Sequence, residues 1–262
     1  MAGSGRWSAR SDRLTQARKV WLLIAVVAAA TGGLLLVDPI AQDPGYHRFA
    51  DARTILGIPN FWNVASNLPF LLAGVLALLQ SRRIASPDLT VHYRILLLSI
   101  ALVAFGSGWY HLSPSMPTLV WDRLPMTVAF MTLLSAVIAD RISWLAGRAL
   151  LWPLVVAGIA SIAWWVRTEN AGAGDLRPYA LVQFLPMLVI PLVLLMWRGE
   201  GLSSRRLWLA LGVYVLAKAA EHFDAALFAA TGMGGHALKH LLAALAAWWI
   251  LRAFQGAPAS AL

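Results

Sequence analysis

The chain has 262 residues, of which 60% are hydrophobic and 13% are charged, whereas water-soluble domains are usually about 45–50% apolar and about 25% charged. This composition excludes an ordinary soluble enzyme, and the lack of cysteine excludes disulfides, iron–sulfur clusters and thiolate ligands. The net charge of +9 would favour nucleic acid in a soluble protein. Here the basic residues lie between apolar runs and are interpreted as membrane anchors, so we expect no nucleic-acid partner.

Apolar runs that approach the length of a membrane-spanning helix, about 20 residues, follow one another along the chain. Eight spans are predicted, at residues 20–37, 61–79, 95–110, 124–139, 149–166, 178–197, 207–230 and 236–251. The predicted fold is therefore an all-α polytopic membrane bundle. One extra N-terminal helix precedes a core of seven helices.

The connections between these runs are short, so the whole chain is predicted to be organised around the bilayer. We expect a basic cytoplasmic segment (1–19), the extra helix (20–37), an extracytoplasmic loop (38–60), the seven-helix core (61–254) and a tail (255–262). The first run could also belong to a signal peptide, because basic residues precede it. Its 18 residues exceed the usual apolar region of about 7–15, which favours a retained helix.

Lysine and arginine are unevenly shared between the two sides of this predicted topology. With the N-terminus in the cytoplasm, 14 of the 21 fall on the cytoplasmic side and five on the other. Cytoplasmic loops carry such an excess, so both termini are predicted to lie inside. The short loops on that side favour a bacterial plasma membrane as the location of this integral protein.

Histidines gather at the predicted extracytoplasmic ends of two spans. His111 closes the third span, and His236 and His240 open the eighth. A spacing of four residues places two imidazoles about 40° apart around a helix and one turn apart along it, which is a geometry that holds zinc. Interfacial histidines bonded to headgroups or backbone are the alternative. His47 and His92 are predicted to lie in solvated loops and are assigned no role.

Two further polar residues are expected near these histidines. Ser107 lies four residues before His111 and shares its helix face, and Asp122 begins the next span. Three imidazoles and a water form an open catalytic zinc site, and zinc activates water and polarises a carbonyl for amide or ester hydrolysis. Asp122 is the candidate for proton transfer and Ser107 for hydrogen bonding to the water or oxyanion. A helix N-cap and a bond to the preceding turn are their respective alternatives.

The second span carries a polar face made of Asn63, Ser66 and Asn67. Side chains of this kind hydrogen-bond between membrane helices, and that is the favoured interpretation. The second interpretation is that these three side chains line the site.

The seventh span carries Lys218, Glu221 and His222 on one face. Lys218 and Glu221, three residues apart, are predicted to form an ion pair. His222 is a candidate neighbour of the ligands and a rival zinc ligand.

The order and spacing of these motifs resemble the alkaline ceramidase family, and the resemblance covers roughly residues 45–252. Phe61-Trp-Asn-Val-Ala-Ser-Asn67 is similar to the start of that family's seven-helix core. Ser107-Gly-Trp-Tyr-His111, Asp122-Arg-Leu-Pro-Met126 and His236-Ala-Leu-Lys-His240 resemble its serine, histidine and aspartate elements. The pattern is shared by the wider superfamily that includes adiponectin-type receptors.

The resemblance implies a zinc ion on His111, His236 and His240, with Ser107 and Asp122 assisting hydrolysis of the ceramide amide to sphingosine and a fatty acid. The eukaryotic enzymes also bind calcium through an acidic segment before the core. Residues 43–60 hold few carboxylates, so no calcium is expected here.

Two other functions are compatible with the sequence. One is a receptor with structural zinc, in which the loop 38–60 caps a ligand. The other is a transporter that uses Lys218, Glu221, His222 and Asp224 as a polar pathway. No inverted repeat or pair of broken helices of the kind transporters use is evident in the sequence.

Overall fold

The computed structural model describes residues 4–255, and no β-strand forms within them. The α-helices are α1 (Ser4–Leu35), α2 (Phe61–Ala65), α3 (Leu68–Leu79), α4 (Thr90–Leu112), α5 (Met116–Arg141), α6 (Trp144–Asn170), α7 (Arg177–Met196), α8 (Ser204–His222), α9 (Asp224–Thr231) and α10 (Gly235–Ala253). Short 3-10 turns occupy Pro44–His47, Ser81–Arg83 and Pro87–Leu89. The predicted all-α class is confirmed.

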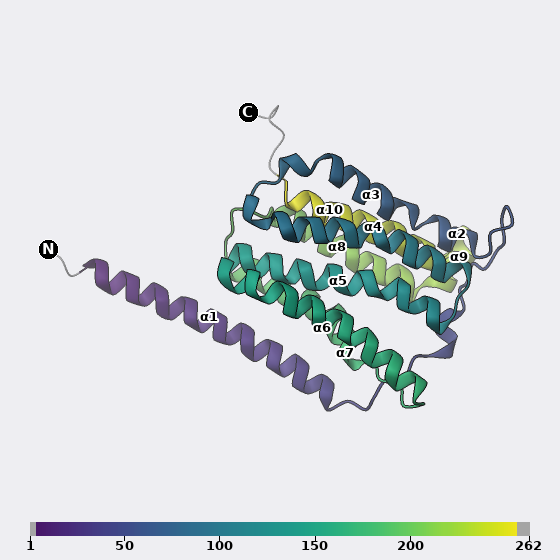
Figure 1. Cartoon of the computed structure of the whole chain (residues 1–262), viewed down its shortest axis with the longest axis horizontal. Coiled ribbons are helices and arrows are strands. Elements are labelled where there is room, and N and C mark those ends of the chain that lie inside the picture. Colours follow the sequence, from purple (N-terminus) through teal and green to yellow (C-terminus); the bar gives the residue numbers. More distant parts are fainter. Residues whose placement is uncertain (1–3, 256–262) are drawn as a thin grey trace.

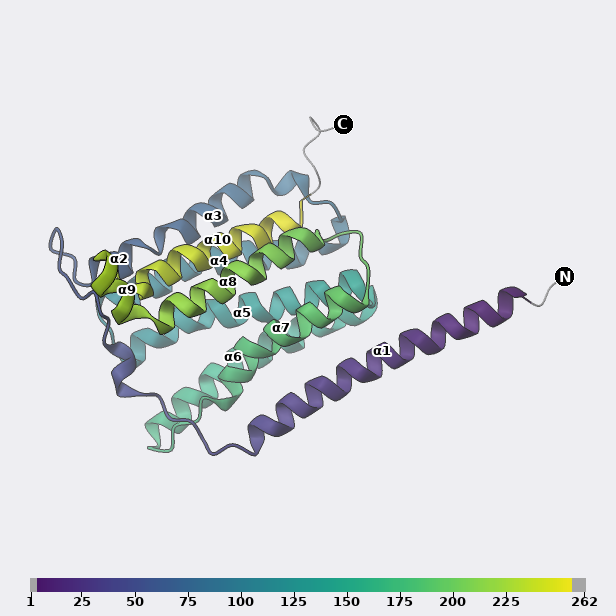
Figure 2. The ribbon, with the colours of Figure 1, turned by 180° about the vertical axis from the view of Figure 1, so that it is seen from behind.

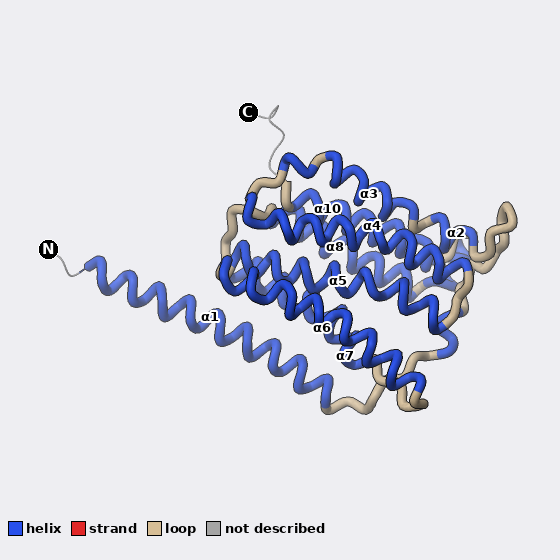
Figure 3. Tube along the Cα trace, viewed as in Figure 1, coloured by secondary structure: helices blue, strands red, loops and turns tan. Residues whose placement is uncertain are grey.

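The long helices from α3 to α10 form one bundle, and α1 lies at its edge along α7 (Figures 1 and 2). Polar contacts hold α1 at its middle and just after its C-terminal end. Lys19 donates to the carbonyl of Met196 at 2.7 Å, and Arg177 donates to the carbonyl of Val37 at 2.7 Å. The loops are short except for the segment between α1 and α2, which crosses one end of the bundle (Figure 3).

Within the described residues, six segments are long and apolar enough to cross a membrane. They are Leu14–Leu35, Phe61–Leu79, Pro87–Leu112, Met116–Arg141, Trp144–Asn170 and Arg177–Met196. The chain is therefore a multi-pass membrane protein, as predicted. The two other predicted spans correspond to α8 and to α10, which are helices of 19 residues each.

Two predicted spans are interrupted. The run 61–79 bends at Ser66 and Asn67 because Pro69, in the first turn of α3, has no N–H to continue the hydrogen bonds of α2. The run 207–230 stops at His222 and restarts as α9. There Asp224 accepts hydrogen bonds from two distant backbone segments, so tertiary contacts pull this turn away from the helix axis.

Several helices begin earlier than predicted, and two residue placements were wrong as a result. α1 begins at Ser4 rather than at residue 20. Because α4 begins at Thr90, His92 is not a loop residue: it is 1% exposed and lies 3.0 Å from the hydroxyl of Ser135. Because α5 begins at Met116, Arg123 is buried in a helix instead of lying in an outer loop.

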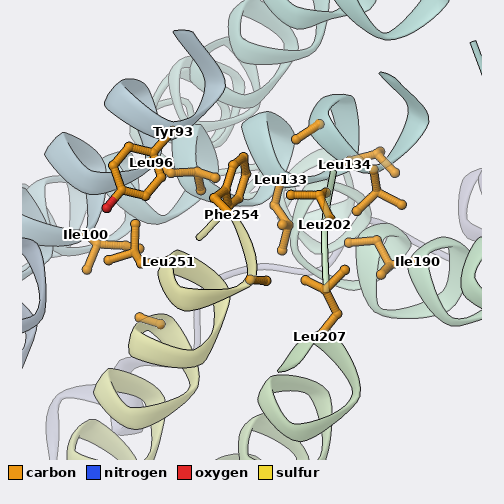
Figure 4. Packing of buried hydrophobic residues seen from close by; sticks show 14 of the residues in the cluster. Tyr93, Leu96, Ile100, Leu133, Leu134, Ile190, Leu202, Leu207, Leu251 and Phe254 are labelled. Atoms are coloured by element: carbon orange, nitrogen blue, oxygen red, sulfur yellow. The ribbon is translucent and has the colours of Figure 1, made fainter. Parts of the chain in front are cut away.

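The apolar core extends to the end of the bundle opposite His111. The core near the start of α4 contains the labelled side chains of Figure 4: Tyr93, Leu96, Ile100, Leu133, Leu134, Ile190, Leu202, Leu207, Leu251 and Phe254. His111 lies 18 residues after Tyr93 on the same helix, which is about 27 Å along its axis. This part of the core therefore lies well away from His111.

Candidate metal centre

Three buried histidines meet at the end of the bundle opposite the apolar core. His111 lies in the last turn of α4, and His236 and His240 lie in the first two turns of α10. Their ring centroids are 4.8–5.0 Å apart, and one ligand nitrogen from each lies within 4.8 Å of the others. The predicted convergence of these imidazoles is therefore present.

Each imidazole has a ring nitrogen left for a metal. Among the described residues, neither nitrogen of His111 has a hydrogen-bond partner, although both are buried. His240 contacts the hydroxyl of Ser66 through Nδ1 at 2.9 Å, which leaves Nε2. Lys239 approaches Nε2 of His236 at 3.0 Å, which leaves Nδ1. Buried nitrogens without partners are costly, and a cation held by three neutral imidazoles resolves that cost.

The second-span polar face predicted at Asn63, Ser66 and Asn67 lies directly against the histidines. Ser66 is beside His240, as described above, and Asn67 donates to the carbonyl of Asn63 at 2.7 Å. Asn63 in turn donates to the carbonyl of Asp51 at 3.0 Å. Only Ser66 and Asn67 contact another helix, both at Nδ1 of His240, whereas the bonds of Asn63 stay within residues 51–67.

Ser107 and Asp122 face each other across α4 and α5. The Ser107 hydroxyl lies near enough to the Asp122 carboxylate to interact with it, and both residues are buried. Asp122 is not the N-cap of its helix, because Ser115 fills that position and accepts from the backbone of Thr118. This pairing depends on Gly106, where a side chain would collide with the carbonyl of Trp121.

The seventh-span residues divide into two groups. Glu221 pairs with Lys218, as predicted, and also accepts from Lys239 of α10 at 2.9 Å. Lys239 therefore links the ion pair to His236. His222 is exposed at the end of α8 and stacks against Phe223, so it does not join the three histidines.

The loop before α2 covers the histidines. The ring of Phe49 lies 4.7 Å from the rings of both His111 and His236. The carboxylate of Asp224 accepts from the backbone N–H groups of Ala50 and His236, both at 2.9 Å. One carboxylate thus holds the loop and the start of α10 together over the site.

Charged groups in this loop are fixed by neighbouring residues. Hydrogen bonds from Arg53 lower the pKa of Asp51, which keeps the carboxylate ionised. Arg53 also donates to the carbonyl of Gly232 at 2.6 Å, which ties the loop to the segment before α10. Burial lowers the pKa of His47, which lies 3.0 Å from the hydroxyl of Tyr110.

Two adjoining cavities lie beside the site. A polar cavity of about 160 Å³ is bounded by Ser107, Asp122 and His240, together with charged and tyrosine side chains. An apolar cavity of about 140 Å³ continues toward the core between α3, α4, α5, α7, α8 and α10. The two share Phe70, Val103, Met126, Tyr214 and Ala243 in their walls. A polar space therefore adjoins an apolar space with walls of hydrocarbon side chains.

Three residues of this region were missed by the sequence reasoning. Phe49 lies in a loop, and no periodicity marks a loop residue that folds over a distant site. Lys239 was given no role, although its position between His236 and His240 was a usable signal. Arg123 was assigned to an outer loop, yet it lines the polar cavity.

Comparison with known proteins gives one match. Residues 55–217, more than half of the chain, match the family model described as Ceramidase. The matched range contains Ser107, His111 and Asp122 and ends before α10. No curated protein matches the chain.

Proposed function

The chain belongs to the ceramidase family, and from this membership we propose that it is a zinc-dependent intramembrane hydrolase. The proposed reaction cleaves the amide of a ceramide-like lipid, a linear amide, to a long-chain base and a fatty acid. The observation that carries the proposal is the meeting of three buried imidazoles beside a Ser107–Asp122 pair. No bound calcium is included, because the loop carboxylate of Asp51 is already paired with Arg53.

The proposed ligands are His111, His236 and His240. Zinc in such a site activates water and polarises the substrate carbonyl. Asp122 accepts the proton of the attacking water and returns it to the amine that leaves. Ser107 donates a hydrogen bond toward the developing oxyanion, and Ser66 fixes the ring of His240 from behind.

Substrate placement follows from the two adjoining cavities. The amide is placed in the polar cavity, within reach of Ser107, Asp122 and His240. One hydrocarbon chain is placed in the apolar cavity, whose walls are formed by side chains such as Leu96, Ile100 and Ile190. Burial of each methylene contributes about 0.8 kcal/mol, so chain length affects affinity.

We propose that α8 and α10 complete eight spans, with α2 and α3 counted as one. The two helices pack against each other along the bundle, and α10 also contacts α3 and α4 (Figures 1 and 2). The start of α1 and the end of α10 lie toward the same end of the bundle, which fits an even number of crossings. The excess of basic residues places that end in the cytoplasm, so the histidines lie near the extracytoplasmic face of what we infer is a bacterial plasma membrane.

The test is hydrolysis by the purified, metal-loaded protein. Equal amounts of long-chain base and fatty acid should be released from an N-acyl sphingoid base, measured by mass spectrometry. His240→Ala should lose metal and turnover together. A variant of an exposed arginine remote from the site, Arg148→Met, should retain both. An intact lipid that binds and is never cleaved would contradict the hydrolase and support the receptor alternative.

A further inference from the structure

Arg123 is a buried cation in the wall of the polar cavity. It is 5% exposed, follows Asp122 on α5 and lines the same cavity as Ser107 and His240. Its guanidinium carbon lies 4.6 Å from the ring of Trp165 and 4.7 Å from that of Tyr179. The ring of Tyr46 is 5.2 Å away. Three aromatic faces therefore surround this side chain.

No carboxylate in the described part of the chain forms a salt bridge with Arg123, and its Nη1 is buried without a hydrogen-bond partner. Another buried arginine of α5 behaves differently. Arg141 contacts the carboxylate of Asp140 at 2.7 Å and also donates to a backbone carbonyl. The aromatic rings attract the faces of the Arg123 guanidinium, but its N–H groups require acceptors.

The other charges around the cavity do not supply the missing anion. The cavity wall holds three cations, Arg123, Lys218 and Lys239, but only two carboxylates, Asp122 and Glu221. Glu221 is shared by both lysines, and Asp122 interacts electrostatically with Arg123 without forming a salt bridge. The cavity wall therefore carries one positive charge in excess, and Arg123 is its cation without a salt bridge. Burial of an unpaired charge is unfavourable. An anion bound in the cavity would therefore stabilise the Arg123 guanidinium.

We propose that Arg123 binds an anionic oxygen group of the lipid inside the polar cavity, as a specificity-determining residue. This rests on the proposed function, which supplies two sources of such a group: the carboxylate of the released fatty acid, or an acidic headgroup on the long-chain base. A guanidinium presents parallel N–H donors that match the oxygens of a carboxylate or phosphate. The side chain of Gln183 lies in the same cavity wall and offers a further donor.

The experiment measures ligand binding to the full-length protein after removal of metal by a chelator, so that no turnover is needed. The probes are myristate, a long-chain base 1-phosphate and neutral tetradecanol. Arg123→Met should weaken binding of at least one anion at least tenfold and leave tetradecanol unchanged. Arg123→Lys keeps the positive charge but not the planar guanidinium, so it should weaken anion binding less than Arg123→Met does. Arg148→Met is the matched control, because Arg148 also lies over a ring, that of Trp144, but is exposed.

The identity of the weakened probe assigns the source of the anion. A loss of affinity for myristate alone indicates that Arg123 binds the fatty-acid product. A loss of affinity for the 1-phosphate indicates that it binds an acidic headgroup on the substrate. Unchanged affinities for both anions in Arg123→Met and Arg123→Lys would overturn the proposal, as would an equal loss for tetradecanol. Arg123-dependent binding in a protein that hydrolyses no lipid amide would refute the hydrolase function alone.

Discussion

Gly106 is the position at which the structure predicts the largest effect from the smallest change. Gly106→Ala adds one methyl group, and its Cβ would lie 2.0 Å from the carbonyl oxygen of Trp121. That is about 1.4 Å closer than the 3.4 Å at which ordinary contact begins. The obstacle is backbone, so α4 and α5 must separate where Ser107 meets Asp122.

Gly108→Ala is the matched control, two residues along the same helix. Its added Cβ would have nothing within 4 Å, so only the gain in helix propensity remains, up to about 1 kcal/mol. Overpacking at Gly106 costs about 1–3 kcal/mol. Both glycines lie inside α4, so the propensity gain is common to the two variants, and their unfolding free energies should differ by the overpacking cost of about 1–3 kcal/mol.

The assay is reversible denaturation in detergent, with metal content and lipid amide hydrolysis measured on the same preparations. Gly106→Ala should be less stable and should lose turnover, because its strain displaces Ser107 from Asp122. Gly108→Ala should match the wild-type protein or exceed it in stability. Equal stability and equal turnover for the two variants would refute the close approach of α4 and α5.

Three further outcomes are expected. Ser66→Ala should weaken metal affinity about 10–100-fold because the hydroxyl orients His240, as measured by competition with a chelating dye. The Ser99 hydroxyl bonds only its own helix, so Ser99→Ala should keep the metal affinity of the wild type. Equal metal affinities for Ser66→Ala and Ser99→Ala would contradict the role of Ser66. Asp122→Asn should keep its metal and lose about 10²–10⁴-fold in turnover, and unchanged turnover would remove Asp122 from the mechanism. Hydrogen bonds from Arg177 lower the pKa of Asp175 to about 2, below the unfolded value of about 3.9. The resulting stabilisation is complete above that value and is lost as pH falls toward 2. Unfolding curves at pH 6 and pH 3 should therefore show a larger acid loss in wild type than in Asp175→Asn, and a constant difference would contradict this.

Much of the site could be predicted because its ligands obey local rules. The spacing of His236 and His240 fixes two imidazoles on one helix face. The alternation of spans brings His111 to the same end of the bundle. Both features are properties of sequence distance and helix geometry, so they need no knowledge of packing.

Other features could not be predicted because they depend on contacts between distant segments. The carboxylate of Asp224 bonds the backbone of Ala50, 174 residues away. Ser66 faces His240 across the same separation. Such contacts bend or end helices at positions where the sequence continues an apolar run.

The burial of Arg123 and His92 shows a second limit of sequence reasoning. Both residues were assigned to loops because charged or polar side chains are disfavoured in membrane helices. In the fold, Arg123 lies among aromatic rings and His92 contacts a buried serine hydroxyl. The partners that make such burial tolerable come from other helices, and a single sequence does not identify them.

X-ray absorption at the zinc edge of the purified protein tests the central claim most directly. The protein should bind one zinc per chain, with three histidine nitrogens at about 2.0–2.1 Å as its main ligands. This three-histidine spectrum should disappear in His111→Ala. A protein that hydrolyses its lipid without bound metal, or a zinc whose surroundings are unchanged in His111→Ala, would contradict the account.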